Sequence, residues 1–307
     1  MFALVILSWG FNWTAAKILV QNMPPLWMVA VRSAIALAVL LVVLPATGNL
    51  QLPKRGDLPA VVNITLLHMV AFAALMAFGL MHVPAGRSIV LGFTTPLWVI
   101  PGAMLFLGEK LTLRRAAGVA LGLGGLALMF NPLAFDWSDR GALLGNGLLL
   151  LAAFCWAMSI LHLRAHRWVS SPFQLLIWEV APATVLLTLL ALAFEGPPAF
   201  AWTPKLALLL LYGGVFGVVV AYWAIAVVNR SLPAMTTSLG ALATPVVGVL
   251  VSIAFTDETF SLSLCVALAM IIGGISLGTL GATAPAPARA PDDAPVPGAP
   301  RSRGPGG

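Results

Sequence analysis

The side chains best suited to chemistry lie inside long apolar segments rather than between them. In residues 2–21, Asn12 follows Ser8 by four positions and Trp13 follows Trp9 by four. Residues four apart lie on one side of an α-helix, so these polar and aromatic side chains share a face. Indole rings can stack on flat or apolar solutes, and a side-chain amide can donate and accept hydrogen bonds. The pattern predicts one wall of a cavity for a small amphipathic solute, although helix packing with tryptophans at the lipid interface would use the same residues.

Matching polar and aromatic residues recur in other apolar segments. We therefore predict that substrate is bound by a wider set: Trp9, Asn12, Trp13, His68, Phe72, Ser88, Thr95, Trp98, Trp156, Ser159, Tyr222, Thr237 and Thr244. Two prolines inside segments, Pro96 and Pro245, are predicted hinges, because a proline removes a hydrogen bond within a helix and frees a carbonyl about one turn earlier. In lipid such a carbonyl needs a hydroxyl, a water or a solute as its partner. Simple kinks and helix packing are the alternative explanations for these positions.

The sequence lacks the residue patterns of an enzyme, a metal centre or an ATP-driven pump. Its two cysteines, Cys155 and Cys265, lie in apolar segments and have no metal-binding spacing. Residues 274–278 match the G-x-S-x-G pattern of hydrolases, but they lie inside an apolar segment, without the strand–turn–helix setting of that motif. A phosphate-binding loop is missing, so ATP is not expected to drive the protein. We predict no catalytic residue, no metal site and no cofactor.

Four charged residues have two interpretations each. Arg32 and Glu179 are the charges furthest inside apolar segments, and an intramembrane charge often marks a functional site. Each lies only about two helical turns from a segment end, and an arginine can extend to the membrane surface, so a structural role is favoured. Glu109 and Glu258 lie at the ends of two matching segments, the fourth and the ninth. They could act as gate carboxylates, but solvated charges in helix-terminal turns are favoured.

A membrane-embedded helical bundle is needed to position these side chains. Of the 307 residues, 60% are hydrophobic and 8% are charged, against about 25% charged in soluble domains. The mean hydropathy is +1.01, and such a composition cannot form a water-soluble surface, which excludes a soluble enzyme. Helices are favoured over a barrel, whose strands would alternate polar with apolar residues. The apolar segments approach the roughly 20 residues that a spanning helix needs. They are 2–21, 25–45, 58–81, 84–107, 112–130, 141–163, 173–194, 204–228, 233–256 and 261–281.

The second half of the chain repeats the first, at an offset of 147 residues early in each half and 149 later. The aligned pairs include Trp9 with Trp156, Pro25 with Pro172, Pro84 with Pro233, Pro96 with Pro245, and Glu109 with Glu258. Each half carries five segments, and an odd number inverts the second half in the membrane. The predicted fold is therefore an all-α membrane protein of ten transmembrane helices, built as two inverted five-helix repeats at residues 1–131 and 139–281. Such repeats are typical of secondary transporters, with a substrate site near the midplane.

Some of these motifs resemble the EamA-domain branch of the drug/metabolite transporter superfamily. The matching residues are a Trp-Gly pair in the first segment, a Pro-Ala, Pro and Gly-Glu series in the fourth, and its echo in the ninth: Trp9, Gly10, Pro84, Ala85, Pro96, Gly108, Glu109, Pro233, Ala234, Pro245 and Glu258. The resemblance covers residues 1–281 and implies two EamA-like repeats, transport rather than catalysis, and a place in a bacterial inner membrane. Within the superfamily, the chain most resembles the YddG-type aromatic amino acid exporters, because tryptophan is abundant and the first segment contains no acidic residue.

Lysine and arginine set the predicted orientation. With the N-terminus in the cytoplasm, eleven of these residues fall on the cytoplasmic side and three fall outside. Cytoplasmic loops carry such an excess, so we predict that both termini are cytoplasmic. Residues 282–307 are rich in proline, alanine and glycine and are predicted to form a disordered cytoplasmic tail. Because the net charge of +6 is spread over these connections, nucleic acid is not an expected partner.

The sequence thus predicts a secondary transporter that exports amino acids, with aromatic and other apolar ones favoured, or similar small metabolites. It would work by alternating access through a central, mostly apolar cavity, with a small-molecule substrate and the lipid bilayer as its partners. A sugar-phosphate or nucleotide-sugar exchanger is the alternative within transport. Such an exchanger needs several cations at the midplane, and the two candidates, Lys17 and Arg32, are too few and too far from it. An intramembrane enzyme and a channel are less favoured alternatives. The enzyme would need a nucleophile with a base within reach, and the channel would need a continuous row of polar residues along the pore.

Overall fold

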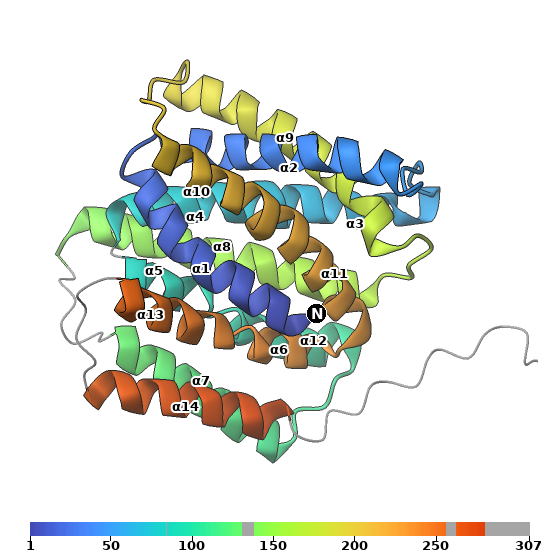
Figure 1. The fold of residues 1–307 in the computed structure, drawn as a ribbon. Coiled ribbons are helices and arrows are strands. Elements are labelled where there is room, and N and C mark those ends of the chain that lie inside the picture. The colour runs from blue at the N-terminus through green and yellow to red at the C-terminus, as the bar shows by residue number, and fades with distance from the viewer. Residues whose placement is uncertain (84, 131–137, 256–261, 280–307) are drawn as a thin grey trace, which may run out of the picture.

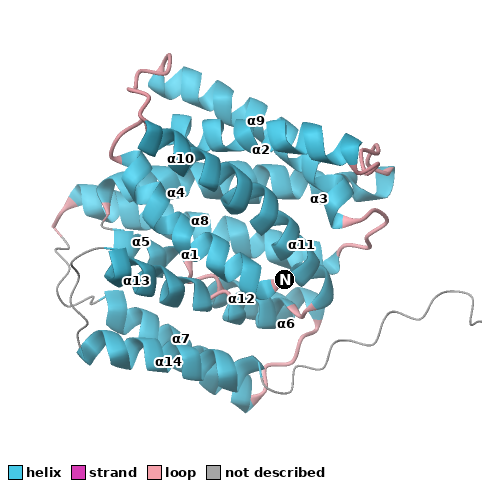
Figure 2. Ribbon diagram, viewed as in Figure 1, coloured by secondary structure: helices cyan, strands magenta, loops and turns pink. Residues whose placement is uncertain are grey.

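The computed structural model describes residues 1–83, 85–130, 138–255 and 262–279. These ranges contain helices and loops and no strand (Figures 1 and 2). Helix occupies part of each of the ten predicted segments, so the all-α fold class is confirmed. Within the described ranges, six helices are long and apolar enough to cross a membrane, and shorter apolar helices accompany them. The total of ten spanning helices stays a prediction, and the tail at 282–307 lies outside the described residues.

The first half contains seven α-helices, one π-helix and a short 3₁₀ turn. In chain order they are α1 (Phe2–Val20), α2 (Pro25–Ala46), the 3₁₀ turn η1 (Arg55–Asp57), α3 (Leu58–Asn63), the π-helix η2 (Ile64–Phe72), α4 (Ala73–His82), α5 (Ala85–Gly92), α6 (Pro96–Leu107) and α7 (Leu113–Phe130). Local chemistry explains several boundaries. Pro25 starts α2, where the missing N–H of proline is harmless. Gly108 ends α6 with φ at 64°, a backbone conformation that glycine adopts readily.

The second half follows the same order. Its elements are α8 (Arg140–Ala165), α9 (Pro172–Glu195), α10 (Pro204–Gly214), the π-helix η4 (Val215–Val220), α11 (Ala221–Ser231), α12 (Ala234–Gly240), α13 (Ala243–Phe255) and α14 (Leu262–Thr279). Side-chain caps fix three of the starts. The Asp139 carboxylate accepts from Ala142 N–H before α8, and the Thr203 hydroxyl accepts from Leu206 N–H before α10. Ser171 forms a capping box at the start of α9.

The fourth and ninth segments are broken, whereas the sequence predicts continuous helices with a proline inside. The break in the fourth segment separates α5 from α6, and Pro96 becomes the first residue of α6. The break in the ninth segment separates α12 from α13, and α13 begins two residues before Pro245. A proline in the first turn of a helix lacks only an N–H that would have no partner inside the helix. Each predicted kink is therefore a helix end followed by a new helix start.

The helices form layers in which corresponding elements of the two halves pair. In Figure 1, α7 and α14 lie side by side at one edge of the bundle, and α2 and α9 lie at the opposite edge. Glycines allow the first pair to approach closely, because a Cβ at Gly118 would lie 2.7 Å from the Gly274 carbonyl oxygen. The G-x-S-x-G match at 274–278 is thus part of a helix contact. Between the two edges, α1 crosses α13 and contacts α10, η4 and α11.

Candidate functional site

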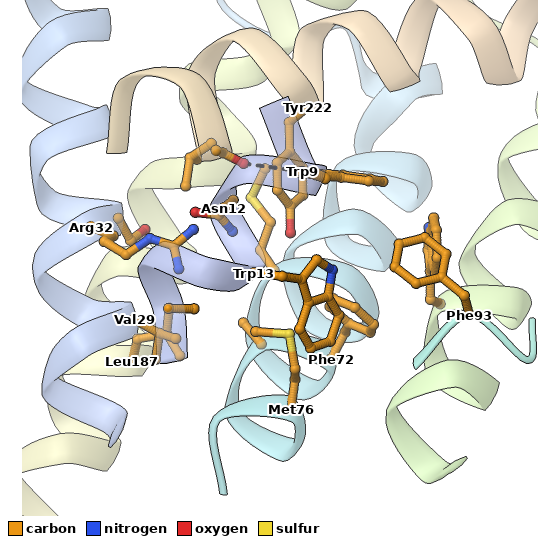
Figure 3. Close-up of a pocket in the computed structure, with 17 residues that line it drawn as sticks. Trp9, Asn12, Trp13, Val29, Arg32, Phe72, Met76, Phe93, Leu187 and Tyr222 are labelled. Atoms are coloured by element: carbon orange, nitrogen blue, oxygen red, sulfur yellow. Dashed lines mark hydrogen bonds between the residues drawn. The ribbon is translucent and has the colours of Figure 1, made fainter. Parts of the chain in front are cut away.

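A central cavity opens between α1, α2, η2, α8 and η4 (Figure 3). Its volume is about 70 Å³, below the roughly 300 Å³ at which small-molecule pockets usually begin, so its walls must move apart to admit an amino acid. The lining residues are Trp9, Asn12, Trp13, Ala16, Val29, Arg32, Ser33, Met69, Phe72, Ala73, Met76, Phe93, Trp156, Leu187, Gly217, Val218 and Tyr222. Six of the predicted substrate-binding residues are in this lining: Trp9, Asn12, Trp13, Phe72, Trp156 and Tyr222.

Aromatic rings from both halves form most of the apolar wall. Trp9 and its repeat partner Trp156 meet edge to face, with ring centroids 5.4 Å apart. Phe72 and Phe93 contact the same Trp156 ring at 5.6 and 5.5 Å. Edge-to-face pairs hold such rings in fixed orientations and leave their other surfaces free to pack on a solute. Trp9, Asn12 and Trp13 of the face predicted in the first segment therefore line the cavity, together with Trp156 of the sixth segment.

His68 lies directly behind this wall and is 2% exposed. Its ring centroid is 4.6 Å from that of Tyr222 and 5.7 Å from that of Trp156. The Nε2 atom has no hydrogen-bond partner among the described residues. His68 supports the lining rings from behind and does not itself line the cavity.

Two π-helices reach the cavity at matching positions of the repeats. Each offers a backbone carbonyl to a side chain of another helix. The Trp9 indole N–H donates to the Gly217 carbonyl in η4 at 3.2 Å, and the Tyr222 hydroxyl donates to the His68 carbonyl in η2 at 3.2 Å. A π-helical turn departs from the regular α-helical hydrogen-bond pattern, and such segments often occur at functional sites. These π-helices could not be predicted from the sequence, because no residue pattern in these apolar segments marks a π-helix.

The polar part of the lining comes from three neighbouring residues of α1 and α2. Asn12 is 9% exposed and its Oδ1 atom has no partner among the described residues. Arg32 is 6% exposed, so it does not extend to the membrane surface as the favoured sequence interpretation assumed. Its repeat equivalent, Glu179, is also buried but is absent from the lining. Ser33 shares a hydrogen bond of 2.7 Å with Thr184.

The other predicted site residues lie away from the lining. Thr95 and Thr244 are buried next to Pro96 and Pro245, and Thr237 is buried within α12. The hydroxyls of all three have no partner within the described ranges. Ser88 is buried and donates to the Val83 carbonyl. Ser159 donates to the Asn63 side chain at 2.8 Å, and Trp98 is 36% exposed and packs on Phe154. Their roles in binding stay predictions.

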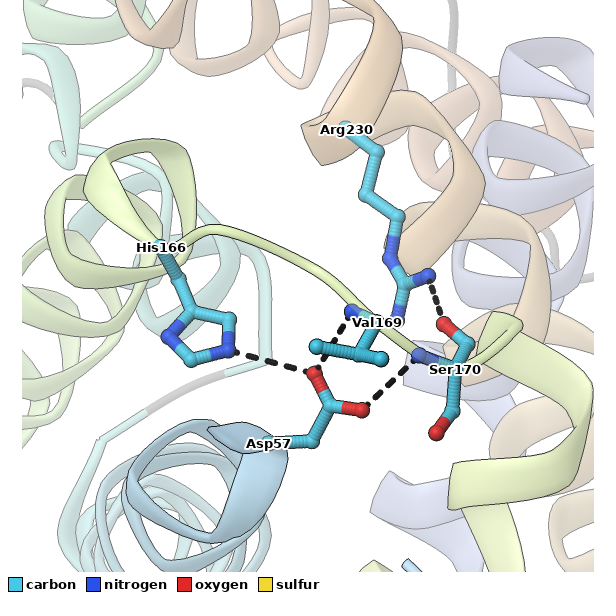
Figure 4. Close-up of polar contacts among 5 residues, drawn as sticks. All are labelled: Asp57, His166, Val169, Ser170 and Arg230. Carbon is cyan, nitrogen blue, oxygen red and sulfur yellow. Dashed lines mark hydrogen bonds and ion pairs between the residues drawn. The ribbon is translucent and has the colours of Figure 1, made fainter. Parts of the chain in front are cut away.

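The residues that connect the second and third segments meet the loop after α8 through a buried carboxylate (Figure 4). We call this the Asp57 network, made of Asp57, His166, Val169, Ser170 and Arg230. The backbone N–H groups of Val169 and Ser170 donate to the Asp57 carboxylate at 3.0 and 2.8 Å. His166 Nε2 lies 3.3 Å from Asp57 Oδ1, and Arg230 donates to the Ser170 carbonyl at 2.6 Å. The network joins both halves of the chain at one end of the bundle.

Two glutamates cap helices that belong to the other half. Glu109 accepts hydrogen bonds from Ala234 N–H at 2.8 Å and Met235 N–H at 3.3 Å, so it caps α12 rather than standing solvated. Glu195 does the same for α2, with 2.8 Å to Leu26 N–H and 3.0 Å to Trp27 N–H. A carboxylate complements the free N–H groups and positive dipole end of a helix. Glu258 lies outside the described residues.

Comparison with known proteins decides the family. The model of the EamA-like transporter family matches residues 1–131 and 143–280. The chain belongs to this family. As an EamA-like transporter it is a multi-pass membrane protein, and its drug/metabolite transporter ancestry agrees with the motifs in its sequence.

Several relatives of this EamA-like transporter carry transporter names. The uncharacterized transporter YoaV of Bacillus subtilis is 24% identical over 90% of this chain and 94% of its own length. The uncharacterized inner membrane transporter YedA of Escherichia coli K12 is 30% identical over 92% and 90%. A probable amino-acid metabolite efflux pump of Escherichia coli K12 is 28% identical over 63% of each chain. A crystal structure at 20% identity has a TM-score of 0.73 and covers 92% of this chain and 96% of that one, which supports the fold.

Proposed function

We propose that this EamA-like transporter exports amino acids, aromatic and other apolar ones above all, or closely related metabolites. The observation that carries the proposal is the cavity lining, in which rings from both repeats surround a space with a few polar groups at one side. Burial against these rings favours an apolar side chain by about 25 cal/mol per Å². The name of the amino-acid metabolite efflux pump among its relatives points in the same direction.

Transport would proceed by alternating access, with the two inverted halves rocking around the cavity. The location that we propose is a bacterial inner membrane, with both termini in the cytoplasm, because lysine and arginine are concentrated on that side. A sugar-phosphate exchanger fits the cavity less well, because Arg32 is the one charged residue in the lining that the structure describes.

The test is counterflow in liposomes that contain the purified protein, with a panel of amino acids and sugar phosphates. Phe, Trp, Met and Leu should exchange with saturable kinetics, and Asp, Glu and phosphorylated sugars should not. Sugar phosphates that compete better than Phe would overturn the proposal. Flux that rises linearly with solute concentration would indicate a channel instead.

A further inference from the structure

The Arg32 guanidinium is a buried charge that no carboxylate among the described residues neutralises. It comes from the second turn of α2 and lines the central cavity. Within the described ranges, the ion pair between His166 and Asp57 is the one salt bridge, so no carboxylate pairs with Arg32. Its Nε atom also lacks a hydrogen-bond partner there. A guanidinium keeps its charge at any physiological pH and presents five N–H donors.

An unpaired charge at this depth is costly. The effective penalty for burying one ion in a protein is several kcal/mol unless an opposite charge and hydrogen bonds offset it. Arginine can avoid the penalty by extending to the membrane surface, but Arg32 is buried and directed toward Asn12 in Figure 3. A charge kept in such a position calls for a partner that enters from the cavity.

The fold makes room for this guanidinium on the opposite helix. Gly213 and Gly217 lie four residues apart, so they share a face of α10 and η4. A Cβ at Gly213 would lie 2.9 Å from Arg32 Cδ. A Cβ at Gly217 would lie 2.9 Å from Arg32 Nη2 and 2.8 Å from Asn12 Oδ1. Larger residues at either glycine would therefore displace the arginine. The contacts of Gly217 also show that the Arg32 and Asn12 side chains converge on the same place beside η4.

The two convergent groups complement the two charges of an α-amino acid. A guanidinium matches a carboxylate, with which it forms paired, charge-assisted hydrogen bonds. The Asn12 Oδ1 atom is an acceptor without a protein partner in the described structure, so it can receive a hydrogen bond from an ammonium group. The aromatic wall formed by Trp9, Phe72 and Trp156 lies next to this polar corner and can hold the side chain.

We infer that Arg32 binds the carboxylate of the transported solute and that Asn12 binds its ammonium group, in the corner that Gly213 and Gly217 leave open. The inference rests on the proposed function and names the group of the substrate that this site recognises.

The test compares phenylalanine with analogues that each lack one charge. Phenylalaninamide lacks the carboxylate, and 3-phenylpropionate lacks the ammonium group. Inhibition of counterflow should be at least about tenfold stronger for phenylalanine than for its amide in the unaltered protein, because one charge-assisted hydrogen bond contributes about 1.5 kcal/mol or more. In Arg32→Gln that ratio should fall to about one. In Asn12→Leu the preference for phenylalanine over 3-phenylpropionate should disappear, while the preference for phenylalanine over phenylalaninamide remains.

Stability measurements separate this role from a structural one. Arg32→Gln removes an unpaired charge, so the purified variant without solute should melt no lower than the unaltered protein. A clear loss of thermal stability, with the amide discrimination retained, would overturn the inference. Gly217→Ala provides a second variant and should weaken phenylalanine binding through contact with Arg32 and Asn12. Its matched control is Gly147→Ala, because a Cβ at Gly147 would meet nothing within 4 Å.

The outcomes also distinguish this inference from the proposed function. If phenylalanine exchanges but Arg32→Gln keeps the preference for the carboxylate, the function stands and the inference fails. If only carboxylates without an ammonium group exchange, and they depend on Arg32, the inference for Arg32 stands and amino acid transport is wrong. If only solutes without a carboxylate exchange, both are wrong.

Discussion

Arg32 in the central cavity and Asp57 at the end of the bundle are both buried charges, but their surroundings differ. Asp57 is fully buried and accepts hydrogen bonds from two backbone N–H groups, with His166 beside it. Arg32 has neither an ion pair nor a partner for its Nε atom among the described residues. A carboxylate that is satisfied inside the protein stabilises the fold. A guanidinium beside a cavity, with no carboxylate paired to it in the described part of the chain, is available to a ligand.

The first prediction concerns where these two regions lie in the membrane. In a background without Cys155 and Cys265, Gly56→Cys should react only with a thiol reagent added from the cytoplasmic side. Ser138→Cys should react only from outside, because the excess of lysine and arginine places the Asp57 network in the cytoplasm. The expected difference is all or none. Reversed labelling, or equal labelling of both positions from one side, would contradict the proposed orientation.

Asp57→Ala should destabilise the protein without changing the substrates that it carries. The substitution leaves the N–H groups of Val169 and Ser170 without their acceptor. Two charge-assisted hydrogen bonds together contribute about 3 kcal/mol or more. The measurement is the thermal unfolding midpoint of the purified protein, together with the KM for phenylalanine counterflow. Asp57→Asn is the control and should lose less, because its amide oxygen still accepts one of the bonds. An unchanged midpoint for Asp57→Ala would remove the distinction between the two charges.

Trp9→Ala and Trp156→Ala should each reduce transport of phenylalanine and tryptophan by roughly tenfold or more while the protein still inserts. Each removes an aromatic wall of the cavity, and burial of a large apolar group contributes about 1.5 to 3 kcal/mol. The control is Trp202→Ala, since Trp202 is 65% exposed and packs on Phe200 at the surface. Transport rates at saturating and low substrate would show the effect, and two variants with normal transport would disprove the assignment.

The smallest effect is expected from a pH gradient. Proton coupling needs a titratable group that faces the cavity, and the described lining contains no Asp, Glu or His. We therefore expect facilitated or only weakly proton-linked movement in liposomes with an imposed gradient. Accumulation many-fold above equilibrium would contradict this expectation and would make Glu179 or His68 the candidate proton site.

Much of the fold was accessible from the sequence, because it depends on local properties. Segment length, turn residues and the internal repeat predict where helices lie. The repeat also identifies Trp9 and Trp156 as equivalents, and the structure places their rings in contact. The breaks beside Pro96 and Pro245 were predicted as kinks, since proline specifies a disruption but not its extent. The sequence does not indicate that Glu195, the last residue of α9, caps α2, because its partners Leu26 and Trp27 are far away in sequence.

The sequence by itself determined that the chain is an all-α membrane protein with matching halves, since a hydrophobic composition and the need to satisfy backbone hydrogen bonds in lipid leave no other arrangement. Only the tertiary structure decided which face of each helix points inward. A helix that is apolar all round carries no amphipathic pattern to show its rotation, so Arg32 could as well have reached the membrane surface. Its position in the cavity results from the glycine face of α10 and η4, which packs against α2 from the other half of the chain.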